Sequence, residues 1–168
     1  QHIGDLKNME TLEFYVQTID QFKKLFRFKP ELLVHDMHPD YLSTKHFQTI
    51  DCKRISVQHH HAHIASCMAE NHLDEKVIGL ALDGVGYGDD SRIWGGEFFV
   101  CDLNKYERFT HFEYLPMPGG DMATKEPWRM ALAFLNKYFG SEVLNKKLEF
   151  LDKFKNRDIE MVLLAIEK

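Results

Sequence analysis

The chain has 168 residues, of which 44% are hydrophobic and 13 are phenylalanine, enough for a real core, because a domain near this length buries about 70% of its unfolded surface. Its formal net charge of -5 is mild and its basic residues are scattered, which argues against a nucleic-acid-binding surface. No apolar run approaches the roughly 20 residues that cross a bilayer. The first five residues do not have the pattern of a signal segment. The three cysteines lack CxxC spacing, which favours a reducing cytoplasm.

The N-terminal third predicts one long helix, two strands and a short helix between them. Apolar residues recur every three or four positions over residues 11–28, which is typical of an amphipathic helix. Short apolar runs predict strands at residues 32–34 and 55–57. Between them Ser43 is placed to cap a short helix over residues 45–49.

A polar segment follows the first predicted strand. Residues 35–41 hold two aspartates and two histidines, among them Asp36 and His38. Two interpretations stay open: a polar turn with capping side chains, or the lip of a functional site.

The histidine run after the second strand is the most unusual part of the sequence. Four of the ten histidines fall within five positions, at His59, His60, His61 and His63, and a run of good helix formers follows. On a helix His59 and His63 stand one turn apart on the same face, near enough to share a metal ion. The alternative is a histidine-rich surface turn or packed rings, since spacing alone supplies no third ligand. Cys67, on the same helix, is expected to be a small core residue.

The next strand leads into a further candidate site. Residues 77–82 are an uninterrupted apolar run, typical of a strand buried on both faces of a sheet. Asp83 follows, with Gly84, Gly86 and Gly88, where α/β enzymes place ligands and metals and where glycines let backbone N–H groups approach an anion. The alternative is a glycine-rich hairpin whose turn Asp83 caps. The segment lacks both the P-loop lysine and the spacing of a dinucleotide fingerprint.

The remaining residues predict an antiparallel strand pair and several helices. Residues 92–100 and 108–115 are the strands. Pro127 opens a helix that Gly140 ends, and Arg129 within it either binds an anion or has a structural role. Further helices are expected at residues 141–150 and 156–168.

These elements predict a mixed α/β sheet flanked by helices. We expect residues 32–34, 55–57 and 80–82 to form neighbouring parallel strands, which residues 92–100 and 108–115 extend in antiparallel fashion. The chain starts without Met and stops inside an amphipathic run, so we also expect it to be part of a longer protein.

Six motifs, in order, resemble the HypF-type carbamoyltransferases of NiFe-hydrogenase maturation, in their large C-terminal domain, which is similar to the Kae1/TsaD family of tRNA threonylcarbamoyl transferases. The motifs are QHIGD at residues 1–5, HDMHPDYLST at 35–44, VQHHHAH at 57–63, DGVGYG at 83–88, WGGE at 94–97, and PGGD at 118–121 with EPWRMA at 126–131.

The resemblance implies an actin-like, ribonuclease-H-like fold, with residues 1–168 forming one incomplete lobe of an ASKHA-type domain. It also implies that His59, His63 and Asp83 hold a Zn or Fe ion. The candidate substrate or nucleotide contacts are His2, Asp5, Asp36, His38, Gly84, Gly86 and Arg129.

By the same resemblance, carbamoyl phosphate and ATP, with Mg, form a carbamoyl-adenylate, and the carbamoyl group passes to the C-terminal cysteine of a HypE-type partner. Neither nucleic acid nor a membrane is involved. The family's acylphosphatase-like, zinc-finger and YrdC-like regions and its C-terminal lobe are expected outside these residues, so this chain alone is expected to be inactive. The alternatives are a non-catalytic metal-binding or partner-docking module, or a related O-carbamoyl or tRNA threonylcarbamoyl transferase.

Overall fold

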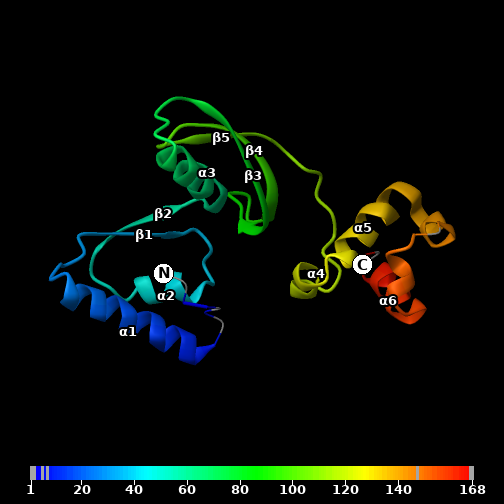
Figure 1. Ribbon diagram of the computed structural model, residues 1–168, viewed down its shortest axis with the longest axis horizontal. Coiled ribbons are helices and arrows are strands. Elements are labelled where there is room, and N and C mark those ends of the chain that lie inside the picture. Colours follow the sequence, from blue (N-terminus) through cyan, green and yellow to red (C-terminus); the bar gives the residue numbers. More distant parts are fainter. Residues whose placement is uncertain (1–2, 5, 7, 147, 167–168) are drawn as a thin grey trace. The chain divides into compact units, whose positions relative to one another are not determined.

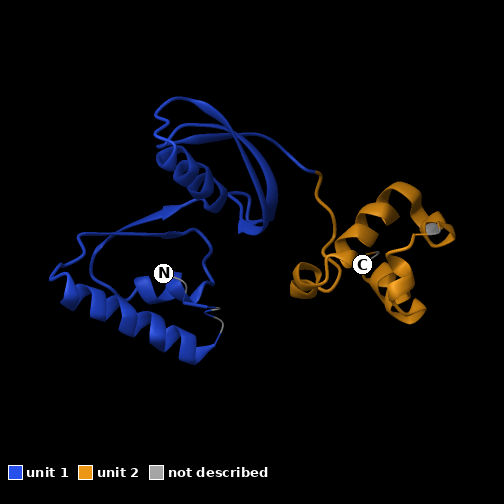
Figure 2. Ribbon diagram, in the orientation of Figure 1, with its two compact units in different colours: residues 1–112 blue, residues 113–168 orange. Residues whose placement is uncertain are grey.

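The computed structural model describes residues 3–4, 6, 8–146 and 148–166 (Figure 1). The chain divides into two compact units, Gln1–Phe112 and Glu113–Lys168 (Figure 2). In the described part of the chain, no helix has the length and apolar character that crossing a membrane would require.

Two helices accompany the first strands. α1 (Met9–Leu25) begins after Asn8, whose side-chain oxygen accepts a backbone N–H from the first turn at 2.8 Å, as a helix N-cap does. α2 (Leu42–Phe47) begins earlier than predicted, so Ser43 lies inside the helix and does not cap it. Both helices lie where the sequence predicted a helix, with ends displaced by a few residues.

The strands form two sheets instead of one. β1 (Leu32–Asp36) and β2 (Lys53–Val57) pair in parallel. β3 (Val77–Tyr87), β4 (Ile93–Cys101) and β5 (Tyr106–His111) form a separate antiparallel sheet in that order. The predicted antiparallel pairing is therefore confirmed, whereas the predicted parallel pairing of the 80–82 strand with β1 and β2 is wrong.

The physical reason is the tight turn that follows β3. Gly88 N–H donates to the Arg92 carbonyl at 2.8 Å, and Ser91 N–H donates to the Gly88 carbonyl at 2.9 Å. A hairpin closes a short loop, whereas a parallel partner needs a long crossover. The strand also runs on through residues 83–87, which were predicted as a loop, with an irregularity in its pairing between Leu82 and Gly86.

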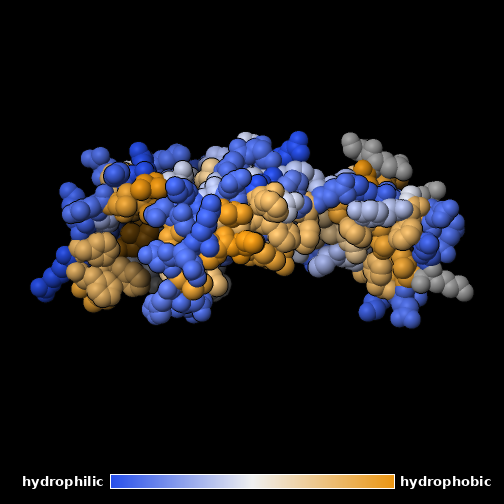
Figure 3. Space-filling model, turned by 90° about the horizontal axis from the view of Figure 1, so that it is seen from above, coloured by the Kyte–Doolittle hydropathy of each residue, from blue (hydrophilic) through white to orange (hydrophobic). Residues whose placement is uncertain are grey.

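Only one face of β3 is buried among the described residues. Gly79 and Ala81 are buried, whereas Ile78, Leu80 and Leu82 are exposed. The prediction of a strand buried on both faces therefore does not hold for the described part of the chain. Figure 3 shows one face of the molecule, on which exposed hydrophobic residues appear in orange.

α3 (His59–Glu70) covers the buried face of β3. Its buried side chains are His60, Ile64 and Met68, at four-residue spacing. A Cβ at Gly79 would lie 2.5 Å from Ile64 Cδ1, so the helix approaches the strand as closely as a glycine permits. This contact fixes which face of α3 points away from the sheet.

The second unit is helical. Its α-helices are α4 (Asp121–Lys125), α5 (Trp128–Phe139) and α6 (Asn156–Ile166). The core cluster consists of Leu132, Val143, Leu151, Ile159 and Val162. As predicted, Gly140 ends α5, with a φ of 55°. α4 was not predicted. In place of the predicted helix over residues 141–150, the structure has a 3-10 helix, Gly140–Asn145, which starts one residue earlier than predicted and ends before residue 150.

Candidate metal centre

The start of α3 is fixed to the end of β3 by Gln58. Its side-chain oxygen accepts the His61 N–H at 2.9 Å, and its amide nitrogen donates to the Tyr87 carbonyl at 3.2 Å. Gln58 is only 2% exposed. Sequence reasoning missed this buried cap, because glutamine is not among the residues that usually cap a helix N-terminus.

Three potential ligand atoms converge beside this helix start. His59 Nε2 lies 2.8 Å from Asp83 Oδ2 and 3.2 Å from His63 Nε2, and His63 Nε2 lies 3.6 Å from the same carboxylate oxygen. The ligand atoms of the three residues all lie within 4.8 Å of one another. The side chain of His63 is 62% exposed, so the group is open to solvent on that side. The structure therefore brings together the three residues that the resemblance selected.

The donor set fits a small divalent cation. Ligand atoms of a tetrahedral zinc ion, with bonds of about 2.0–2.2 Å, are roughly 3.3–3.6 Å apart, and the three separations here run from 2.8 to 3.6 Å. Imidazole nitrogen and carboxylate oxygen are suitable ligands for zinc and for iron. With no proton or cation among these atoms, their lone pairs would face one another.

Opposing effects set the protonation of the group. Burial alone would lower the pKa of His59, but hydrogen bonds to Asp36 and Asp83 outweigh it and raise that pKa above its ordinary value. Burial would raise the pKa of Asp83, but the hydrogen bonds from His59 and from the Gly84 N–H, together with nearby His63, lower it. Both shifts have the same physical cause: the protonated His59 ring and the ionised Asp83 carboxylate stabilise each other.

We expect divalent metal binding to strengthen as the pH rises through and above 6.5. The cation must displace the proton on His59, whose pKa is raised from 6.5. Affinity should therefore fall by roughly tenfold for each pH unit below that raised pKa and level off above it. Zinc titration calorimetry from about pH 6 to about pH 8 in two buffers of different ionisation enthalpy measures both the affinity and the protons released. A pH-independent affinity would contradict this expectation.

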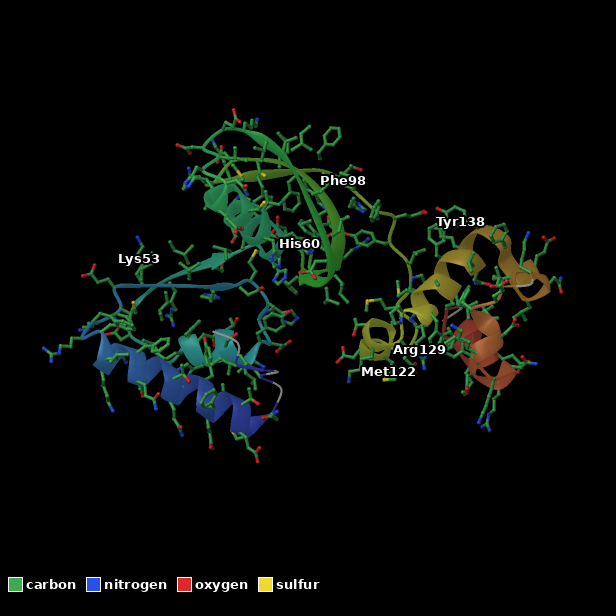
Figure 4. The ribbon with its side chains drawn as sticks, viewed as in Figure 1. Lys53, His60, Phe98, Met122, Arg129 and Tyr138 are labelled. Carbon is green, nitrogen blue, oxygen red and sulfur yellow. The ribbon has the colours of Figure 1, made fainter. Side chains whose placement is uncertain are left out.

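His60 belongs to the core and is not a ligand (Figure 4). It is fully buried, with its ring centroid 6.3 Å from that of Trp94. Its Nδ1 lies 3.2 Å from the Gln58 amide nitrogen, and its Nε2 has no hydrogen-bond partner among the described residues. Burial, followed by the charge of His59, lowers the pKa of His60, which keeps the ring neutral. The interpretation as packed rings thus holds for this histidine.

Replacing Gly86 by alanine should destabilise the protein by about 1–3 kcal/mol, the usual cost of overpacking. A Cβ at this position would lie 2.4 Å from Cε1 of the enclosed His60 ring. Urea unfolding measures the effect, and Gly84→Ala is the matched control, since its Cβ would meet nothing within 4 Å. Equal stabilities of the two variants would show that the ring moves aside freely.

Asp36 lies beside the metal centre. Its Oδ2 is 2.7 Å from His59 Nδ1, and its Oδ1 accepts the His38 N–H at 2.8 Å. The polar-turn interpretation is therefore confirmed. That the segment is the lip of a functional site stays a prediction, which the contact between the same carboxylate and His59 supports. The His38 ring stacks on Tyr41, with a centroid distance of 4.1 Å.

The other predicted contacts belong to different parts of the chain. Gly84 and Gly86 are residues of β3. Arg129 lies in the second unit (Figure 4), where its Nε donates to Glu126 Oε2 at 2.5 Å. The remaining two, His2 and Asp5, fall outside the described residues.

Cys67 is exposed, contrary to the prediction of a core residue. It lies four positions after His63, on the helix face of the metal centre, whereas Ile64 and Met68 occupy the buried face. Whether Cys67 is buried depends less on its apolar character than on which face of α3 packs on β3.

Two family models match the chain. Residues 1–70 match the HypF Kae1-like domain, and residues 79–168 match the second subdomain of the carbamoyltransferase Kae1-like domain. The junction falls between α3 and β3, which is where the structure separates its two sheets. The candidate metal centre thus draws two histidines from one matched region and Asp83 from the other.

Similar proteins carry the same family name. Carbamoyltransferase HypF2 of Cupriavidus necator is 46% identical over 140 residues, which are 81% of this chain and 17% of that protein. Carbamoyltransferase HypF of Synechocystis sp. is 38% identical over 162 residues, or 94% of this chain and 21% of that protein. The chain therefore spans about a fifth of the length of these relatives.

Two crystal structures are also similar. Full-length HypF in the phosphate- and nucleotide-bound form aligns with a TM-score of 0.82 and 47% identity, over 99% of this chain and 22% of that one. HypF of T. kodakarensis aligns with a TM-score of 0.81 and 38% identity, over 99% of this chain and 23% of that one.

Proposed function

Since the chain belongs to the HypF family of carbamoyltransferases, within their Kae1-like domain, we propose that it supplies the metal-binding part of a carbamoyl-transfer site. The observation that carries the proposal is the convergence of His59, His63 and Asp83 on one point. The related O-carbamoyl and tRNA enzymes are not favoured, because the matching models are those of HypF.

The proposed reaction has two stages. Water first cleaves carbamoyl phosphate to carbamate and phosphate. A carbamate oxygen then attacks the α-phosphorus of ATP, with Mg, so that pyrophosphate leaves and a carbamoyl-adenylate forms. The thiolate of the C-terminal cysteine of a HypE-type partner then takes the carbamoyl group. In the second stage a carbon–sulfur bond forms, the bond between the carbamoyl carbon and the adenylate oxygen breaks, and AMP leaves with the electron pair. A related HypF was crystallised in a phosphate- and nucleotide-bound form, which supports nucleotide use here.

The residues of the centre have distinct roles in this proposal. His59, His63 and Asp83 would hold a divalent zinc or iron ion, which acts as a Lewis acid toward the carbamoyl or adenylate oxygen. Three protein ligands leave a position for an exchangeable one, as a catalytic site requires. Because the His63 side chain is exposed, substrate could approach the centre from the side of this ligand.

The test is ATP–pyrophosphate exchange dependent on carbamoyl phosphate, in a full-length protein that contains this chain. Mass spectrometry of the partner then detects the thiocarbamoyl group, and a partner without its C-terminal cysteine is the control. We expect exchange only with carbamoyl phosphate present, and modification only of the intact partner. Exchange that ignores carbamoyl phosphate, or a metal-binding protein without exchange, would contradict the proposal and favour a non-catalytic module.

A further inference from the structure

We propose that Asp36 is a positioning residue for the metal centre: it holds the His59 ring with the proton on Nδ1, so that Nε2 is free to bind the ion. The inference rests on the metal-ligand role proposed for His59. It differs from the substrate contact that the resemblance suggested for Asp36.

Both oxygens of the Asp36 carboxylate are engaged. Oδ2 lies 2.7 Å from His59 Nδ1, and Oδ1 accepts the His38 N–H at 2.8 Å. The side chain is 18% exposed, less than the 35% of Asp83. A carboxylate held at both oxygens has a fixed direction, so the ring that contacts it is also held in one orientation.

The backbone brings these two residues together. β1 and β2 pair in parallel with Asp36 opposite Val57, and the Met37 N–H donates to the Val57 carbonyl at 3.2 Å. α3 begins two residues after Val57, at His59. The carboxyl ends of adjacent parallel strands therefore deliver the carboxylate and the imidazole to the same edge of the sheet.

The geometry allows only one proton arrangement in which His59 binds a cation. A neutral imidazole has one N–H and one lone pair. If Nε2 carried the proton, the Nδ1 lone pair would face the Asp36 carboxylate at 2.7 Å. If Nδ1 carries it, that N–H donates to Asp36, and the Nε2 lone pair joins those of His63 and Asp83 at the centre. A carboxylate behind a metal-ligating histidine acts in this way in many metal sites.

Replacing Asp36 by asparagine should weaken zinc binding by roughly 10–100-fold, the usual effect of losing such a partner. Asparagine has nearly the same shape and its oxygen still accepts the His38 N–H, so the loop should keep its fold. Its amide N–H, however, can donate to His59 Nδ1 and move the ring proton to Nε2. The matched control is Asp40→Asn, which removes the same charge from a carboxylate paired with Lys45 at 2.9 Å and not with His59.

The experiment uses a full-length protein that contains this chain and has two readouts. Zinc affinity is measured by competition with a chromophoric chelator. Zinc binding that persists in His59→Ala is treated as background, so that the affinity refers to this site. The second readout is 15N solid-state NMR of metal-free, histidine-labelled protein at a pH where the ring is neutral, with the His59 signal identified by its loss in His59→Ala. It is recorded in an Asp83→Ala background, because this removes the carboxylate that faces His59 Nε2 at 2.8 Å. A purely structural role for Asp36 would not move the proton from one ring nitrogen to the other.

In the Asp83→Ala background we expect an Nδ1–H ring, which Asp40→Asn leaves unchanged and Asp36→Asn converts to an Nε2–H ring. With Asp83 intact, we expect roughly 10–100-fold weaker zinc binding in Asp36→Asn and wild-type binding in Asp40→Asn. Unchanged affinity and tautomer in Asp36→Asn would overturn the inference, as would an equal loss of affinity in Asp40→Asn. A wild-type protein that binds no zinc at this site would instead refute the proposed metal role. The ring tautomer in the Asp83→Ala background would still decide whether Asp36 positions His59.

Discussion

Replacing His59 or His63 by alanine is expected to abolish carbamoyl transfer while changing the fold little. Each substitution leaves two of the three ligands, too few to hold the ion in place. Polarisation by a bound metal contributes several kcal/mol, so the rate should fall by on the order of 10³-fold or more. Transfer to the partner cysteine, followed by mass spectrometry in a full-length protein, measures this effect.

The matched control for both variants is His72→Asn. His72 is an exposed histidine just past the end of α3, with a φ of 56° that asparagine tolerates. It should retain wild-type transfer and wild-type stability. Full activity in both His59→Ala and His63→Ala would rule out the metal role, whereas equal losses in all three variants would indicate a general effect on folding.

The 168-residue chain by itself is expected to show no useful rate of exchange or transfer. It spans about a fifth of the length of its relatives, and its candidate centre has one widely exposed ligand, His63. Each preorganised donor around a reacting group contributes about 3 kcal/mol. If the rest of the protein supplies two such donors, the rate without them falls by roughly 10⁴-fold.

ATP–pyrophosphate exchange, run with this chain and with the full-length protein side by side, measures the difference. Circular dichroism of the isolated chain is the necessary control, because an unfolded fragment would be inactive for a different reason. A folded chain that matched the full-length rate would place the whole site within these residues and refute the expectation.

Most of the α-helices, though not α4, could be predicted because their signals are local. The apolar spacing of α1, the run that forms α3, and the flanking Pro127 and Gly140 of α5 each act within a few residues. The sheet could not be predicted in the same way. An apolar run such as β3 predicts a strand with core-facing side chains. Which strand pairs with it, however, depends on contacts between residues that are distant in sequence.

The same distinction applies to the site. The spacing of His59 and His63 shows that one helix face carries both, and the structure places them together. That Asp36 meets His59 depends on the parallel register of β1 with β2, which no local pattern contains. Cys67 was misplaced for a related reason: the buried face of α3 is set by the close contact between Ile64 and Gly79.

The most direct test of the metal centre is anomalous diffraction at the zinc or iron absorption edge, from crystals of a full-length protein that contains this chain. We predict one anomalous peak bonded to His59 Nε2, His63 Nε2 and an Asp83 carboxylate oxygen at about 2.0–2.2 Å. Metal-supplemented crystals with no peak there, and with His59 still hydrogen-bonded directly to Asp83, would contradict the account.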